Sequence, residues 1–127
     1  GWRAPRPATP QEITGIVDAF AAAARRAVRA GFDFIELHGA HGYLLHEFFS
    51  PVTNRRDDAY GGDLARRMRL LLDVAEATRA AIPRDMPLFW RASVEDNMEG
   101  GIALTDTIAL AKELRARGVD LMDCSSG

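Results

Sequence analysis

The regular alternation of helical and strand-like segments is the feature that most constrains how this chain can fold. The predicted helices start at Pro10, near Asp63 and after Thr105, and the predicted strands cover residues 32–38, 88–93 and 119–124. A chain that is ordered helix–strand–helix–strand–helix–strand is typical of β/α units packed around a parallel sheet. The sequence therefore predicts an α/β fold.

Residues with strong helix-end preferences mark the predicted helices. Thr9, Pro10 and Glu12 match a capping box with proline at the first helical position. Gly31 can end that helix, and Thr105 is predicted to cap the last one. The predicted core residues are Ile13, Ile16, Val17, Phe20, Ala24, Ala27, Val28, Leu64, Met68, Leu71, Leu72, Ala75, Ile82, Ile108, Ala111, Leu114, Phe34, Phe89 and Trp90.

A weak internal repeat narrows the choice among α/β folds. Residues 31–36 and 118–123 match position by position in character, and each segment follows a helix rich in Arg and Ala. Their separation equals about two β/α units of the size found in eight-stranded barrels. A doubly wound sheet would fit the same order of elements, but its usual Gly-rich phosphate turn is missing. We therefore expect a partial (β/α)8 barrel with about three consecutive β/α units from its middle.

Strand alternation predicts which side chains share a face of the sheet. The face expected to point into the barrel carries Glu36, His38, Phe89, Arg91, Ser93, Asp123 and Ser125, and the opposite face carries Ile35, Leu37, Leu88, Trp90 and Ala92. In a barrel, active sites form at the carboxyl ends of the strands. We therefore expect the polar face to line the functional site.

The segment from His38 to Tyr43 is the densest group of candidate catalytic residues. Two imidazoles three residues apart, His38 and His41, can direct two N–H donors at one oxygen and stabilise the negative charge that develops on it. The Tyr43 phenol can give a proton to an adjacent carbon. Gly39 and Gly42 would let the backbone turn tightly and approach a ligand closely. These residues suit the reduction of a conjugated carbonyl or nitro compound.

Other interpretations of the histidines stay open. His38 and His41 could bind a metal, but no third ligand stands at a strong spacing, and His46 with Glu47 makes no recognised metal pattern. The two histidines could also be ordinary capping or packing groups. We assign no metal, and we expect His46 to be structural.

Arg91 is the second candidate, because an arginine in an apolar strand needs a partner. It could lie against an electron-rich ring and favour the anionic, reduced form of that ring. It could equally form an interior ion pair with Glu36 or Asp123.

Composition excludes several classes of function. The 16 Lys+Arg and 18 Asp+Glu residues leave a net charge of −2, which shows no footprint for nucleic acid. No apolar run approaches the roughly 18–20 residues of a membrane span. The single cysteine, Cys124, excludes an internal disulfide and fits a reducing compartment; we expect it to be a packed thiol.

The stretch from Ser50 to Gly62 is expected to be an ordered loop, fixed by local Asn and Asp hydrogen bonds and Arg–Asp pairs.

These motifs together resemble one known family. The matching residues are His38-Gly39-Ala40-His41-Gly42-Tyr43-Leu44, Phe48/Phe49-Ser50-Pro51, Asn54-x-Arg56-x-Asp58-x-Tyr60-Gly61-Gly62 and Arg67. They resemble the old yellow enzyme family of FMN-dependent NADH:flavin oxidoreductases and ene-reductases, most closely its thermophilic-like bacterial class. The resemblance runs from Thr9 to Gly127, and its longest specific stretch lies between His38 and Gly62.

The resemblance implies a cofactor, a reaction and residue roles. FMN would be the cofactor, NADH or NADPH the electron donor, and a small activated alkene the substrate, with hydride delivered to its beta carbon. His38 and His41 would bind the substrate's activating oxygen, Tyr43 would protonate the alpha carbon, and Arg91 would lie beside the pyrimidine edge of the flavin. The loop ending at Gly62 would be structural.

The resemblance also implies that residues 1–127 are the central part of an FMN-binding barrel domain. The family's first strands would precede Gly1, and its last two strands, which hold the FMN phosphate, would follow Gly127. We therefore expect this chain alone to be inactive, to bind FMN weakly or not at all, and to have open sheet edges that can pair with another chain. We expect the full-length protein to be a cytoplasmic homo-oligomer.

Three alternative functions remain. A dienoyl-CoA reductase or an amine dehydrogenase of the same family would act on other substrates, although those relatives carry an iron–sulfur cluster and no cysteine cluster is present here. A non-catalytic half-barrel module would work by association. A metal-dependent barrel hydrolase would use His38 and His41.

Overall fold

The computed structural model describes residues 6–126, which form three β/α units around one sheet. The elements in chain order are α1 (Pro10–Ala30), β1 (Ile35–Gly39), α2 (Leu44–Phe49), α3 (Leu64–Ala81), β2 (Leu88–Ser93), α4 (Leu104–Ala116) and β3 (Leu121–Ser125). The strands are parallel and lie in the order β1-β2-β3. The predicted alternation of helices and strands is confirmed.

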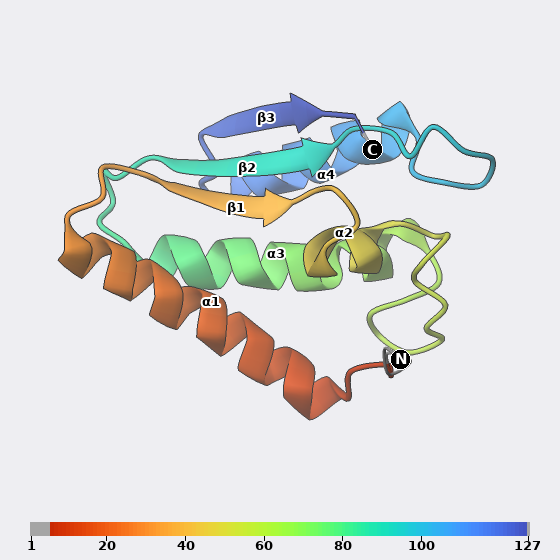
Figure 1. Cartoon of the computed structure of the whole chain (residues 1–127), viewed down its shortest axis with the longest axis horizontal. Helices are drawn as coiled ribbons and strands as arrows, with labels where there is room; N and C mark the ends of the chain where they lie inside the picture. The colour runs from red at the N-terminus through yellow and green to blue at the C-terminus, as the bar shows by residue number, and fades with distance from the viewer. Residues whose placement is uncertain (1–5, 127) are drawn as a thin grey trace, which may run out of the picture.

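The core lies between the sheet and the helices on one of its faces. In Figure 1, α1 and α3 lie on the same side of the sheet and pack against each other. Trp90 and Leu88 of β2 are fully buried and belong to the same apolar cluster as Leu71 of α3 and Leu114 of α4. No described helix covers the other face of the sheet, so its side chains are half-buried or exposed, except that of Ser93, which is buried beneath the turn after β1.

The ends of α1 and α3 form as their sequences predict. The Thr9 hydroxyl accepts the amide of Glu12 at 3.2 Å, and the Glu12 carboxylate accepts the amide of Thr9 at 2.8 Å. Gly31 ends α1 with a φ of 84°, a left-handed conformation that glycine adopts without a Cβ clash. The Asp63 side chain caps α3 by accepting the amide of Arg66. These local signals were sufficient because each involves residues only a few positions apart.

The start of α4 was predicted wrongly. The helix begins at Leu104, so Ala103 is its N-cap and Thr105 lies inside the first turn. The predicted buried face was also partly wrong: Thr107, Leu110 and Leu114 are buried, whereas Ile108 is 46% exposed and Ala111 is half-buried.

Two strand predictions also needed correction. β1 starts at Ile35 rather than at residue 32, and β3 covers residues 121–125 rather than 119–124. Phe34 is 50% exposed and stacks on Phe89, with ring centroids 5.0 Å apart, so neither ring belongs to the buried core. Within residues 6–126, where β3 is the outer one of the three strands, Cys124 is an exposed thiol rather than a packed one.

Candidate active site at the carboxyl ends of the strands

The register of the sheet brings the predicted site residues into adjacent rows. His38 of β1 pairs with Arg91 of β2, and Arg91 pairs with Asp123 of β3. Nearer the carboxyl ends, Ser93 pairs with Ser125. Since paired residues in neighbouring strands point to the same face, the predicted polar face is present, and it is the face that the helices leave open.

A tight turn joins β1 to α2 and carries His41. The Tyr43 amide donates to the carbonyl of Ala40 at 3.2 Å, and the two central residues, His41 and Gly42, have φ of 59° and 74°. Gly42 serves the turn that the sequence predicted. A histidine at positive φ is uncommon, and such strained positions concentrate at functional sites.

Gly39 has a different role from the predicted one. A Cβ built at this position would lie 2.5–2.6 Å from atoms of the Trp90 indole. The absence of a side chain at Gly39 therefore lets β1 pass the buried ring, a contact that no local pattern predicts.

The turn brings three rings together. The ring centroids of His38 and His41 lie 5.3 Å apart at 64°, and those of His38 and Tyr43 lie 5.3 Å apart at 53°. Tyr43 precedes the first residue of α2 and is 64% exposed, so its phenol is accessible. The two imidazoles and the phenol that the sequence singled out thus form one accessible cluster.

Two serines that the sequence placed on the polar face, without giving them a role, hold His41. Its backbone amide donates to Ser93 Oγ at 3.0 Å, and its Nε2 lies 2.8 Å from Ser125 Oγ. If the Ser125 hydroxyl donates to Nε2, the proton of the neutral ring is on Nδ1, where it can be donated to a ligand. The available signal was the strand parity, which places both serines on this face.

Arg91 forms one of the two ion pairs considered from the sequence. Its Nε lies 3.5 Å from Asp123 Oδ2, and both side chains are 39% exposed. This distance meets the criterion for an ion pair, but the contact does not have hydrogen-bond geometry, and Nε is buried without a hydrogen-bond partner among the described residues. A buried donor of this kind can be satisfied by a bound group.

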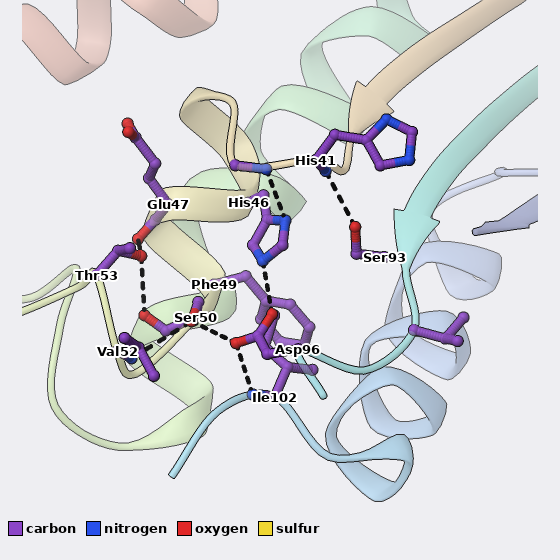
Figure 2. Close-up of polar contacts among 12 residues, drawn as sticks. His41, His46, Glu47, Phe49, Ser50, Val52, Thr53, Ser93, Asp96 and Ile102 are labelled. Atoms are coloured by element: carbon purple, nitrogen blue, oxygen red, sulfur yellow. Dashed lines mark hydrogen bonds and ion pairs between the residues drawn. The ribbon is translucent and has the colours of Figure 1, made fainter. Parts of the chain in front are cut away.

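A second polar cluster lies beneath the turn, where Figure 2 shows His46 between the turn and Asp96. His46 Nε2 lies 2.8 Å from Asp96 Oδ1, and the two side chains are only 9% and 6% exposed. Burial alone would raise the pKa of the Asp96 carboxyl. Hydrogen bonds from Ser50, from the amide of Ile102 and from His46 outweigh that effect and lower this pKa below its usual value. The geometry supports the structural interpretation of His46.

The loop from Ser50 to Gly62 is ordered by local contacts, as predicted. The Asn54 amide group donates to the carbonyls of Phe48 and Tyr60 at 2.6 and 2.8 Å. Arg56 makes a two-point ion pair with Asp58 that lowers the pKa of that carboxyl. These contacts tie the loop to the end of α2.

No three His, Cys, Asp or Glu side chains among residues 6–126 come together in a way that could hold a metal ion. Over the same range, no helix is both long enough and apolar enough to cross a bilayer.

The sequence of this chain is similar to those of curated NADPH dehydrogenases. The chain is 49% identical over 125 residues to an NADPH dehydrogenase of Halalkalibacterium halodurans, covering 98% of this chain and 36% of that protein. It therefore spans about a third of the length of the curated relatives it matches.

Two solved structures match the fold of this chain over nearly its whole length. A 2-naphthoyl-CoA reductase in complex with 2-naphthoyl-CoA superposes with a TM-score of 0.90 and 33% identity, over 96% of this chain and 19% of that one. The old yellow enzyme homologue from Zymomonas mobilis superposes with a TM-score of 0.84 and 34% identity, over 95% and 35% of the two chains. The expectation of part of a (β/α)8 barrel is confirmed by these matches.

The family model for NADH:flavin oxidoreductases matches residues 3–127, almost the whole chain. The resemblance found in the motifs is thereby confirmed, and the chain belongs to the NADH:flavin oxidoreductase / NADH oxidase family.

Proposed function

We propose that the whole protein containing this chain is an FMN-dependent ene-reductase. It takes hydride from NADPH or NADH and reduces the activated C=C bond of unsaturated carbonyl or nitro compounds. The observation that carries this proposal is the cluster of His38, His41 and Tyr43 on the same face of the sheet as Arg91. We further propose that residues 1–127 are the central part of the barrel domain, and that the protein is a cytoplasmic homo-oligomer.

Each residue of the cluster has a chemical task in this proposal. His38 and His41 donate hydrogen bonds to the substrate's carbonyl or nitro oxygen and stabilise the charge that develops on it. Ser93 and Ser125 keep His41 in place through its amide and its Nε2. Tyr43 gives a proton to the alpha carbon, which its exposed phenol can approach.

Arg91 suits a place beside the cofactor. Its guanidinium lies in the row between His38 and Asp123, and its buried Nε can donate to an acceptor on the edge of a flavin ring. A positive charge there favours the anionic, reduced form of the ring. FMN held there would supply the hydride-transfer chemistry that the side chains lack.

The Tyr43→Phe variant tests the central assignment. We expect the half-reaction with an alkene to slow by about 100-fold or more, in the range typical of general acid catalysis, while reduction by NADPH stays within about twofold. Stopped-flow measurement of the two half-reactions separates these effects. An equal loss in both would remove the proton-donor role.

Ligand binding and cofactor content provide readouts besides activity. The double variant His38→Ala/His41→Ala should weaken binding of a phenolic ligand, measured by titration, and unchanged affinity would contradict the oxygen-binding role. The purified whole protein should be yellow and contain FMN. A colourless zinc protein would favour the metal-dependent hydrolase, and a colourless, soluble, well-defined oligomer would favour the association module.

A CoA-thioester reductase is the second candidate within the family. It is favoured by the structural match to a protein in complex with 2-naphthoyl-CoA. Steady-state kinetics with an enoyl-CoA and with a simple unsaturated ketone distinguish the two, because the true substrate class should have the higher kcat/KM.

A further inference from the structure

We propose that His46 is a positioning residue, which fixes the turn carrying His41 and Tyr43 through the hydrogen bond that it accepts from the Gly42 amide, and that Asp96 sets the tautomer in which His46 can accept it. The effect on the reaction rests on the function proposed above, whereas the positioning itself is a property of the fold. Neither residue belongs to the ring cluster, and they act through the turn.

The hydrogen bonds define the state of His46. The Gly42 amide donates to His46 Nδ1 at 3.0 Å, so Nδ1 must be unprotonated. The ring proton is then on Nε2, which donates to Asp96 Oδ1 at 2.8 Å. A neutral imidazole in a single tautomer therefore connects the backbone of the turn to a carboxylate 50 positions later in the sequence (Figure 2).

Asp96 is itself held from several sides. Its Oδ2 accepts the Ser50 hydroxyl at 2.6 Å and the Ile102 amide at 2.8 Å, and its own amide donates to the Ile102 carbonyl at 3.1 Å. A Cβ at Gly101 would lie only 2.5 Å from the Cβ of Asp96, so the returning loop packs tightly on this side chain. His46 is thus hydrogen-bonded to a fixed carboxylate. It connects the turn after β1, through Gly42, to the loop after β2, through Asp96.

The turn needs such a restraint because of its backbone conformation. His41 and Gly42 both have positive φ, and for a histidine this conformation costs free energy that surrounding contacts must offset. Gly42 lies between His41 and Tyr43, so a change in the direction of its amide would move both rings. The Nδ1 acceptor belongs to a side chain that is only 9% exposed, and it holds that amide in place.

Two substitutions test the hydrogen bonds of the two ring nitrogen atoms of His46 one at a time. His46→Asn keeps an acceptor near the position of Nδ1 but does not reach Asp96. His46→Gln can place an N–H near the position of Nε2 but offers no acceptor for Gly42. If the Nδ1 contact positions the turn, Asn should preserve it and Gln should not.

Amide hydrogen exchange of the FMN-loaded whole protein measures the positioning without catalysis. We expect exchange at the Gly42 amide to become about 3- to 10-fold faster in His46→Gln, as for the loss of one neutral hydrogen bond, and to stay within about twofold in His46→Asn. The same rate in both variants would overturn the proposal. Imidazole nitrogen NMR of the unsubstituted protein provides a test that needs no variant: a proton on Nδ1 of His46 would also overturn it.

Half-reaction kinetics then test the effect on the chemistry. His46→Gln should slow the alkene half-reaction about 3- to 10-fold, and His46→Asn should restore most of that loss. If alkene reduction is unchanged in His46→Gln while Tyr43→Phe is slow, the functional part of this inference is wrong. If Gly42 exchange responds as expected but Tyr43→Phe has no effect on alkene reduction, the ene-reductase proposal fails and the positioning remains.

Discussion

Gly39, at the end of β1, offers a direct test of how closely the strand passes the core. A Cβ at this position would lie 2.5 Å from Trp90 Cζ2 and 2.6 Å from Cε2 and Nε1, well inside the 3.4 Å at which ordinary contact begins. The indole cannot easily move aside, because it is fully buried in the central strand of the sheet. We expect Gly39→Ala to lower the free energy of unfolding by about 1–3 kcal/mol, as overpacked cores do.

Equilibrium urea unfolding of the whole protein, followed by circular dichroism, measures this loss. Gly15→Ala is the matched control, because its Cβ would meet nothing within 4 Å and it lies within α1. That control should gain about 0.5–1 kcal/mol. In a double-mutant cycle with Trp90→Phe, the cost of Gly39→Ala should shrink by about 1 kcal/mol or more. A neutral Gly39→Ala, or strict additivity with Trp90→Phe, would refute the argument.

Three further predictions concern polar side chains at and around the site. Ser125→Ala removes the hydroxyl on Nε2 of His41 and should weaken binding of a phenolic ligand by up to about tenfold; unchanged affinity in a titration would show that the contact does not orient the ring. Asn54→Ala leaves two backbone carbonyls without their donor and should cost about 1–3 kcal/mol in urea unfolding, so a loss below the error of the method would count against the bracing role of the loop. The folded structure lowers the pKa of the Asp96 carboxyl below its usual value of 3.8, so as the pH falls this carboxyl is protonated first in the unfolded chain. The ionised carboxylate therefore stabilises the fold fully above pH 3.8. This stabilisation is lost as the pH falls through the lower pKa of the folded state. Unfolding measured between pH 5 and 2.5 should therefore decline less steeply in Asp96→Asn, and parallel curves would contradict this assignment.

Sequence patterns predicted those features that depend on neighbouring residues. The Thr9 capping box and the bounds of β2 agree with the structure, because helix caps and strand alternation involve residues one to four positions apart. The same alternation placed His38, Arg91 and Asp123 on one face, and the family motif identified the turn that holds the ring cluster.

Local patterns failed where more than one arrangement satisfies them. Thr105 is an acceptable cap, yet α4 starts one residue before it, and Ile108 is exposed although its spacing suits a core residue. Phe34 has the composition of a core residue, but it precedes β1 and stacks on the open face of the sheet. In both cases the packing of neighbouring elements decided between conformations that the sequence permits.

Patterns within the sequence were thus enough to predict the order of the β/α units, the polar face of the sheet and the family. The tertiary structure alone decided the partners of the site residues: Ser125 for the ring of His41, Trp90 for Gly39, and Asp96 for His46. The physical reason is distance along the chain. Each of these contacts joins residues about 50 or more positions apart, and they meet only when parallel strands bring their carboxyl ends to one edge of the sheet.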